Sequence, residues 1–395
     1  MVTTIVKAIK PSGLGDYTTL SAWNIGRRGN LVTRDSAYPG TGGDPSGTVE
    51  VAEIYSGGNV GPVDSESSNG WVTNSTHYIW LRAATGEGHT GVFNASKAYV
   101  QATVGYQSCI RFDLGYTHIG PGLSLETVAS GNPAGIIFRN SATVGPMTLE
   151  GCIIRRAVAQ SAGSYFALVD LDAVLSVGDY NVIKNCILYD TGTGSGSNSY
   201  IVAIGLNYTR ASNTKIYNCT IMMKVAYYGI ARYAGTVISQ NNYISAGTSY
   251  LGTITKGTND ATSNTEAVTS NLRSVLYTTA NFKNVTLGSE DFHLVVSAAN
   301  KLLDHGANLT SEGVTTDIIG TARPQFGTFD IGAFENDIPI CWNYTARYKN
   351  SNKLFKASGC GVFPKNLKVP GNVDRSTGRM IDDGILINPD EYHIV

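Results

Sequence analysis

Aspartates between residues 170 and 190 are the side chains of this sequence best placed for acid–base chemistry. Asp170 and Asp172 are two positions apart, so on a β-strand they would project from the same face. Asp179 and Asp190 belong to the neighbouring repeat of the chain and could join them. Two carboxylates cleave a sugar bond when they lie about 5–5.5 Å apart for retention or about 6.5–9.5 Å apart for inversion. If the protein is an enzyme, these four aspartates are its predicted catalytic residues, in a glycoside hydrolase or a polysaccharide lyase.

The same acids also fit a structural interpretation. Arg155 and Arg156 precede the aspartates by one repeat, so the aspartates could form local ion pairs with these arginines on a solvated face. Between Asp190 and Asp260 the sequence contains no Asp or Glu at all, so strands in that stretch cannot supply a catalytic pair. The sequence therefore favours ion pairing over catalysis and leaves enzymatic activity undecided.

The six cysteines could serve as nucleophiles, metal ligands or disulfide partners, and Asn218-Cys219-Thr220 also matches a glycosylation acceptor. There is no CxxC pair and no cysteine–histidine cluster at zinc spacing. These absences argue against a disulfide framework and a structural metal, and they favour cysteine as a small buried apolar side chain. The six histidines are scattered, with no HExxH spacing. No metal and no cofactor is predicted.

The spacing of the cysteines indicates repeated strands. Four segments share a pattern in which Asn or a small residue precedes Cys or Asn, and an apolar residue follows two positions later. This period-2 alternation is typical of a strand with one buried face. A second motif, Gly followed by Ile or Leu, precedes three of the segments at positions 135, 205 and 229. The four segments are Leu149–Ile154, Ile183–Leu188, Ile216–Ile221 and Asn241–Ile244.

If the segments stack as rungs of a solenoid, the central residue of each occupies an equivalent interior position. We expect this ladder to consist of Cys152, Cys186, Cys219 and Asn242. The asparagines at 185, 218 and 241 would then lie at equivalent turns, where Asn tolerates the left-handed backbone region. Helical solenoids are excluded because no window shows a sustained 3.6-residue period.

Composition agrees with an all-β fold. Charged residues are only 15% of the 395-residue chain, and 45 residues are Gly, which suits tight turns and solvent-facing strands better than exposed helices. A formal net charge of -1 provides no positive field to attract phosphate backbones or anionic lipid. No apolar run approaches the ~18 residues of a membrane span, and no signal peptide is recognised. Neither nucleic acid nor a membrane is an expected partner.

On these repeats the chain resembles right-handed parallel β-helix proteins, the fold of pectate lyases and of many bacteriophage tailspikes and virion surface proteins. Its C-terminal part is similar to the closing segment of such repeat proteins, and Gly15–Trp23 is similar to their N-terminal cap. The resemblance covers roughly residues 5–335. The motifs that carry the closing segment are Asp291–Leu294, Asp304–Gly306, Asp317–Pro324 and Asp330–Glu335.

Three regions are expected. Residues 1–60 form an N-terminal cap and the first strands, 61–335 the β-helix with its closing segment, and 336–395 an extended C-terminal arm. Both ends of a parallel stack must be covered, since open edges pair with other chains. A short helix over residues 18–27, with Thr18 as N-cap and Leu20, Trp23 and Ile25 apolar, would cover the first coil.

The closing segment also contains a charged set with a predicted structural role. Arg323 lies in the sequence among three acids, Asp317, Asp330 and Glu335. A buried guanidinium held by carboxylates would fix the geometry of this cap, because its fork of donors matches carboxylates bidentately. A catalytic role for these acids is the less favoured alternative.

The resemblance and the arm together suggest a function. We expect a non-enzymatic structural protein of a bacteriophage particle, a homotrimeric decoration or spike bound to other virion proteins of capsid or tail, with decoration slightly favoured. It would be assembled in the host cytoplasm and lie on the virion surface. The alternatives are a tailspike-type enzyme that cleaves host surface polysaccharide, and a sugar-binding adhesin using exposed tyrosines. The adhesin would require tyrosines such as Tyr217, Tyr227, Tyr228 and Tyr243 on an outer face.

Overall fold

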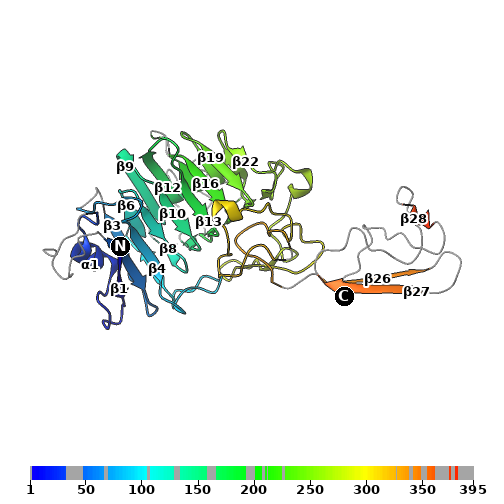
Figure 1. The fold of residues 1–395 in the computed structure, drawn as a ribbon, viewed down its shortest axis with the longest axis horizontal. Coiled ribbons are helices and arrows are strands. Elements are labelled where there is room, and N and C mark those ends of the chain that lie inside the picture. The colour runs from blue at the N-terminus through cyan, green and yellow to red at the C-terminus, as the bar shows by residue number, and fades with distance from the viewer. Residues whose placement is uncertain are drawn as a thin grey trace.

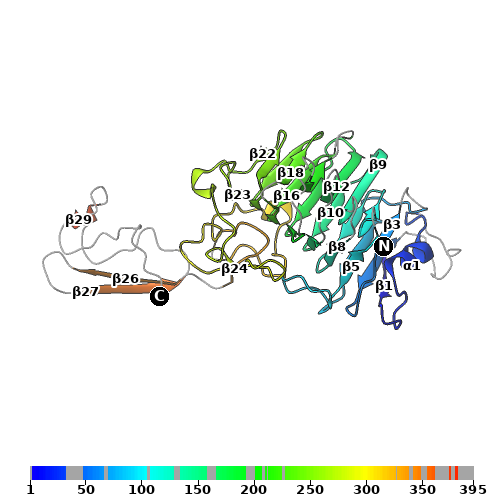
Figure 2. The same cartoon turned by 180° about the vertical axis from the view of Figure 1, so that it is seen from behind.

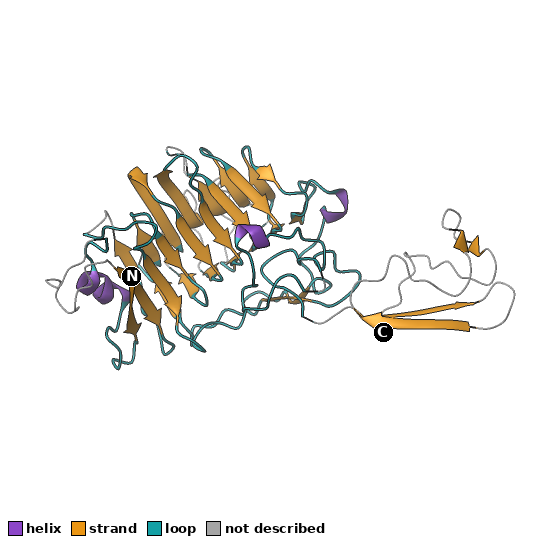
Figure 3. Cartoon of the chain, in the orientation of Figure 1, coloured by secondary structure: helices purple, strands orange, loops and turns teal. Residues whose placement is uncertain are grey.

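The computed structural model describes most of the chain, and within the described part the fold is all-β. Helical structure there comprises α1 (Leu20–Arg27) and two short 3-10 turns, η1 (Ser270–Leu272) and η2 (Thr310–Glu312). Figure 3 shows the dominance of strands. None of the described helices has the length and apolarity to cross a membrane. The described residues are 2–32, 48–65, 70–104, 107–128, 134–157, 166–192, 201–206, 210, 212–224, 227–325, 327–337, 341–347, 354–360, 373–374 and 379–380.

Three long sheets, in which every strand pairing is parallel, make up the body of the protein. Sheet 1, in spatial order, contains β1 (Thr3–Ile9), β2 (Thr48–Ile54), β4 (Ile79–Ala83), β7 (Thr117–Ile119), β10 (Met147–Glu150), β13 (Asn181–Lys184), β16 (Thr214–Tyr217), β19 (Val237–Gln240) and β22 (Thr255–Lys256). Sheet 2 contains β5 (Tyr99–Ala102), β8 (Ser124–Thr127), β11 (Ile153–Arg156), β14 (Ile187–Asp190), β17 (Thr220–Met222), β20 (Tyr243–Ser245) and β23 (Ala261–Thr262). Sheet 3 contains β3 (Val63–Ser65), β6 (Ile110–Phe112), β9 (Ile136–Val144), β12 (Phe166–Leu175), β15 (Ile201–Leu206), β18 (Tyr228–Arg232) and β21 (Thr248–Leu251).

The chain visits the three sheets in rotation. From β4 to β21, each strand of sheet 1 is followed by one of sheet 2 and then one of sheet 3, and the chain ends its last round with β22 of sheet 1 and β23 of sheet 2. Each strand pairs with the strand of the same sheet one round earlier and one round later, so the rounds stack as coils (Figure 1 and, from behind, Figure 2). These stacked, all-parallel sheets are compatible with the parallel β-helix expected from the sequence.

Alternating side chains fill the interior between the sheets. In sheet 1, Leu149, Ile183 and Ile216 are aligned in register on β10, β13 and β16, and all three are fully buried. Apolar rows of this kind give each coil a face that its neighbouring coils bury. This burial stabilises the fold by roughly 25 cal/mol per Å² of apolar area removed from water. The stack is therefore held by its own core.

The corner between sheets 1 and 2 has the same backbone geometry in four successive coils. Gly151, Asn185, Asn218 and Asn241 have φ of 59°, 53°, 50° and 59°. This is the left-handed region, which Gly adopts freely and Asn tolerates better than most residues. The asparagines thus lie at the equivalent turn positions that the sequence predicts.

The glycine motif is only partly equivalent between coils. Gly135 and Gly229 occupy the same position, where an added Cβ would lie 2.5 Å from Ile154 Cγ2 and 2.4 Å from Ile244 Cγ2 respectively. Gly205 does not match them, because it is paired with Asp170 and Ala231 further along sheet 3. The Gly motif therefore marks one structural position in two coils and a different position in the third.

Helix α1 lies at the N-terminal end of the stack, close to β1 and β3. Its N-cap is Thr19, whose hydroxyl accepts a hydrogen bond from Ala22 N at 3.1 Å, and not the predicted Thr18. Leu20 and Trp23 are buried as expected, but Ile25 is 62% exposed. The helix begins one residue later than predicted because the side chain of Thr19, in extended backbone, accepts the hydrogen bond of a first-turn amide.

After the last coil, the described residues between 263 and 335 form the loop-rich closing segment. It contains η1, η2 and an antiparallel pair, β24 (Phe282–Asn284) and β25 (Asp291–Leu294). Two further antiparallel pairs follow it: β26 (Cys341–Arg347) with β27 (Leu354–Cys360), and β28 (Val373–Asp374) with β29 (Arg379–Met380). The other residues of the predicted 336–395 arm, apart from 336 and 337, lie outside the described residues.

Candidate functional site

The predicted cysteine ladder lies in the interior of the stack. Strand register places Cys152 beside Cys186, Cys186 beside Cys219, and Cys219 beside Asn242 at the start of sheet 2. All four residues are fully buried. Burial raises the pKa of Cys152 and Cys186 above the usual thiol value, which keeps both protonated at neutral pH. Protonated, buried thiols are packing elements and not nucleophiles.

The ladder becomes polar at its C-terminal end. Asn242 Oδ1 accepts a hydrogen bond from Cys219 N at 2.8 Å, and Asn242 N donates to Asp260 Oδ1 at 2.8 Å. Asp260 Oδ2 accepts from Ser239 Oγ at 2.7 Å and Tyr250 Oη at 2.8 Å. Burial raises the pKa of Asp260 to about 6. Sequence reasoning missed this residue, although Asn259-Asp260 repeats the Asn-Cys spacing of the earlier coils.

Three of the four predicted catalytic acids, Asp170, Asp172 and Asp190, are paired with arginines. Asp170 and Asp172 lie two residues apart on β12; Asp170 Oδ2 accepts a hydrogen bond from Arg139 Nη2, and Asp172 Oδ2 accepts one from Arg210 Nη1 at 2.8 Å. Both aspartates are buried. Burial raises the pKa of Asp170, and the neighbouring Arg139 opposes that shift. Asp170 Oδ1 is buried without a hydrogen-bond partner, so within the described residues this carboxylate has one unused acceptor.

The structure does not bring all four predicted acids together. Asp190 ends β14 in sheet 2, where both its oxygens accept hydrogen bonds from Arg156, at 3.0 Å from Nε and 2.8 Å from Nη2. Asp179 lies in the turn between β12 and β13 and is partly exposed. Asp170 and Asp172 lie in sheet 3. The arrangement is a set of separate ion pairs on neighbouring coils.

Arginines 155 and 156 show why adjacent charges separate. Successive residues of a strand point to opposite faces. Arg156 is fully buried with Asp190, whereas Arg155 donates from Nε to Glu126 Oε1 at 2.7 Å and stacks over the Phe93 ring at 3.4 Å. Sequence reasoning did not identify Glu126 or Phe93, because they come from other coils.

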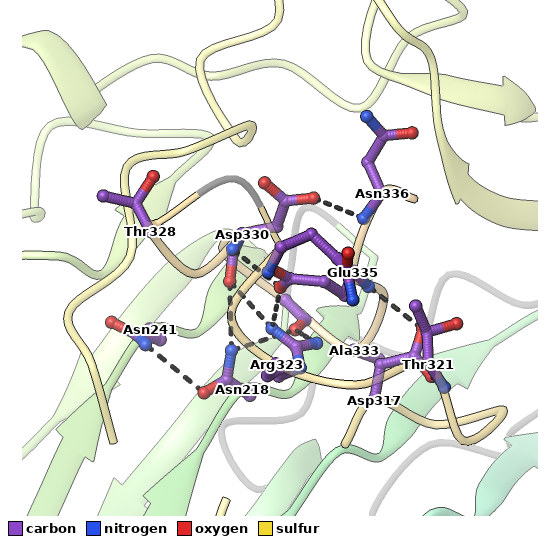
Figure 4. Close-up of polar contacts among 12 residues, drawn as sticks. Asn218, Asn241, Asp317, Thr321, Arg323, Thr328, Asp330, Ala333, Glu335 and Asn336 are labelled. Carbon is purple, nitrogen blue, oxygen red and sulfur yellow. Dashed lines mark hydrogen bonds and ion pairs between the residues drawn. The ribbon is translucent and has the colours of Figure 1, made fainter. Parts of the chain in front are cut away.

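In the closing segment, Arg323 is a buried hub. Its Nη1 donates to Glu335 Oε2 and to Asp330 O, both at 3.0 Å, and its Nη2 donates to Gly332 O at 2.9 Å (Figure 4). Its ion-pair partner is thus Glu335, while the other contacts are backbone carbonyls. Burial lowers the pKa of Arg323 and raises that of Glu335, and the ion pair between them opposes both shifts.

The two remaining acids of the predicted set hold backbone amides. Asp317 Oδ1 accepts hydrogen bonds from Ile319 N at 2.9 Å and Thr321 N at 2.8 Å, and its Oδ2 accepts one from Glu335 N at 3.0 Å. Asp330 accepts from Asp304 N at 2.7 Å and Asn336 N at 2.6 Å. Burial raises the pKa of Asp330 to about 7. The four predicted residues therefore form one hydrogen-bonded network, which holds the loops of the closing segment in their conformation.

Corner asparagines join this network to the stack. Asn185 Nδ2 donates to Thr316 O at 2.7 Å, and Asn218 Nδ2 donates to Asp330 O at 3.0 Å. Asn241 exchanges two hydrogen bonds with Ala307, at 2.7 Å and 2.8 Å. Figure 4 shows Asn218 and Asn241 facing the Arg323 network. The repeated Asn thus has two roles, because it turns the coil and also binds the closing segment.

Apolar packing places the closing segment on the flank of the stack. On sheet 2, Tyr189 packs edge-on against Phe292 at 5.2 Å between ring centroids, and Tyr243 packs at a tilt against Phe282 at 5.0 Å. Ile153 and Ile187 on the same face belong to the same buried cluster. The sequence predicted a cover over the open end of the solenoid, but much of this segment covers the outer face of sheet 2. That face is apolar and therefore must itself be buried.

At the other end, sequence reasoning missed a buried ion pair. Arg27 of α1 donates to Glu50 of β2, at 2.6 Å from Nε and 2.9 Å from Nη2, and both side chains are almost fully buried. Trp71 Nε1 donates to Asn24 Oδ1 of the same helix at 2.7 Å. The helix is thus tied to the first coils by polar contacts, which its apolar pattern alone does not reveal.

The tyrosines proposed for sugar binding are mostly buried. Tyr217, Tyr227 and Tyr243 have exposures of 3%, 1% and 0%. Only Tyr228 of this set is partly exposed. Among the described residues, no group of three or more His, Cys, Asp or Glu side chains is placed to hold a metal ion.

Comparison of the chain with protein-family models, with curated proteins and with solved structures gives no match.

Proposed function

We propose that the chain is a non-enzymatic structural protein of a bacteriophage particle, built on a right-handed parallel β-helix. It acts as a homotrimeric decoration or spike on the virion surface, attached to other proteins of the capsid or tail. Residues 1–60 provide the N-terminal cap, 61–335 the β-helix with its closing segment, and 336–395 an arm for oligomerisation or docking. Nucleic acid and membrane are not partners in this proposal.

The non-enzymatic class is supported by the ion pairing of three of the four candidate acids. Asp170, Asp172 and Asp190 are buried, and each has its own arginine. A carboxylate that acts on a glycan must reach the substrate, and a buried ion-paired carboxylate does not. The charged residues are thus used to hold coils and loops together.

The second candidate function is cleavage of host surface polysaccharide. It is favoured by Asp170, whose Oδ1 has no hydrogen-bond partner and whose raised pKa is typical of a general acid. The neighbouring Asp172 would supply the second carboxylate.

Incubation with purified surface polysaccharide of the host, followed by chromatography of released oligosaccharides, distinguishes the two functions. The structural proposal expects no release. Release that is lost in Asp170→Asn and Asp172→Asn variants, but retained in an Asp179→Asn control, would establish the enzyme instead. Release retained in all three variants would place catalysis at other residues and would equally exclude the structural class.

The trimer is tested by sedimentation of the full chain at micromolar concentration. We expect a single species with three times the mass of the chain. A stable monomer with the arm intact would exclude the trimer.

A further inference from the structure

Two of the six cysteines lie outside the stack, at paired positions of an antiparallel hairpin. The strands β26 and β27 pair antiparallel, with Cys341 directly opposite Cys360. The pair closes the hairpin at the end away from the connecting residues 348–353, since the register runs from 341↔360 to 347↔354. The other four cysteines, Cys109, Cys152, Cys186 and Cys219, are buried free thiols of the stack.

The register has the geometry that a disulfide needs. Directly opposed residues of an antiparallel pair have Cα atoms about 4.5 or 5.5 Å apart, depending on their hydrogen bonding. Disulfides span Cα separations of about 4.4–6.8 Å, so either arrangement falls within the range. Opposed residues also share one face of the hairpin. A shift of either strand by one residue would place the two cysteines on opposite faces.

We propose that Cys341 and Cys360 are a disulfide-forming pair that staples the C-terminal hairpin. The thiolate of one cysteine attacks a small-molecule disulfide, such as oxidised glutathione, and releases one small thiol. The second cysteine then attacks the mixed disulfide and releases the other. Two protein thiols are oxidised to one S–S bond, the oxidant is reduced to two thiols, and the two cysteine protons end on those thiols.

The staple would respond to the compartment. Cytosolic glutathione keeps such pairs reduced, whereas an extracellular medium allows them to close. Closing the bond fixes a loop of residues 342–359 and limits the open states of the hairpin, whose sheet contains only β26 and β27 among the described residues. This inference does not depend on the phage assignment, because it rests on strand register alone.

Thiol counting after exposure to oxidised glutathione tests the proposal directly. The full chain is incubated with glutathione disulfide, denatured without reductant, alkylated and digested with trypsin. We expect four alkylated cysteines and one cross-linked peptide that joins Cys341 to Cys360, against six alkylated cysteines after reduction. Six alkylated cysteines in the oxidised sample, a different cysteine pair, or a covalent dimer on a non-reducing gel would each overturn the proposal.

A register variant provides the matched control. In a Cys341→Ser background, Trp342→Cys keeps the number of thiols and nearly the same loop length, but it places the thiol opposite Gly359 and on the other face. We expect no intramolecular cross-link in this double variant, while the parent forms it almost completely. Equal cross-linking in both would show that strand register does not pair these cysteines.

Discussion

At the residue scale, buried charges decide how this protein is held together. Arg27, Arg156 and Arg323 are almost fully buried, and each is paired with one carboxylate. Removing one partner of such a pair leaves an uncompensated buried charge, which is costly, whereas exposed pairs contribute little. Arg323 also holds two backbone carbonyls, so the conformation of the closing segment depends on this single side chain.

The first prediction concerns that guanidinium. Arg323→Met should lower the free energy of unfolding by about 3–5 kcal/mol, because the Glu335 carboxylate remains buried without its counter-charge. Arg82→Met is the control, since Arg82 donates to Glu53 at 3.0 Å but its side chain is 30% exposed. This control should lose only about 0–1 kcal/mol. Urea denaturation measures both, and equal losses would contradict the role of Arg323.

The second prediction concerns pH. Burial raises the pKa of Asp330 to about 7 and that of Asp260 to about 6, from an ordinary 3.8. The folded state therefore holds these protons more tightly than the unfolded state. Their stabilisation is complete below the ordinary pKa and is lost as pH rises through about 6 and about 7. Burial lowers the pKa of His89 from an ordinary 6.5 to about 4, so its contribution has the opposite sign: stability is lost as pH falls from 6.5 toward about 4.

Variants separate these contributions. From about pH 5 to about pH 8, the free energy of unfolding measured by urea denaturation should fall with rising pH in the parent. It should fall less in Asp330→Asn. Asp16→Asn is the control, because a hydrogen bond from Ala8 N lowers the pKa of Asp16 and its titration lies below this range. An unchanged pH slope in Asp330→Asn would contradict the raised pKa.

At the element scale, the corner between sheets 1 and 2 both turns the chain and binds the closing segment. Asn185, Asn218 and Asn241 have positive φ and donate their side-chain amides to loops more than 60 residues away, with separations of 131, 112 and 66 residues. A glycine would adopt the positive φ but could not donate the side-chain hydrogen bond to the closing segment. Most other residues would meet neither requirement. Asn is therefore the residue type that meets both requirements.

The third prediction separates the two roles of Asn218. Asn218→Gly keeps the left-handed backbone and loses the hydrogen bond to Asp330 O, so we expect a loss of about 0.5–1.5 kcal/mol. Asn218→Ala loses the same hydrogen bond and adds backbone strain of about 1–2 kcal/mol. Thermal or urea unfolding should therefore rank parent, Gly and Ala in decreasing stability. An alanine variant as stable as the glycine variant would show that φ at this corner is not constrained.

At the scale of the whole molecule, the stack was predictable because its sequence pattern repeats. The docking of the closing segment on the stack was not predictable, because it depends on contacts between residues far apart in the sequence. The period-2 segments around Cys152, Cys186 and Cys219 fixed the inward positions of sheet 2, because each coil repeats the local pattern of its neighbour. The place of the closing segment was not predictable, since its partners are outward residues such as Tyr243 that look like ordinary strand positions in the sequence. Arg27 and Glu50 were missed for a similar reason, because a helix and a strand that are distant in sequence bring them together.

The expected gathering of acids fails for a geometric reason. Asp170 and Asp172 share a strand, but Asp190 lies on the next sheet, and alternation along the strand turns Arg156 toward it and Arg155 away. Sequence proximity between coils is therefore not spatial proximity when the chain changes sheet. A stack whose charged side chains are used internally is suited to a rigid structural role.

We propose that the chain is a structural component of a phage particle. Density-gradient purification of particles carrying its gene, followed by quantitative mass spectrometry, tests this directly. We predict that the chain co-sediments with the major capsid or tail proteins at a constant ratio across the particle peak, and that its copy number is a multiple of three. Absence from the particle peak, with the chain remaining in the soluble fraction, would contradict the account.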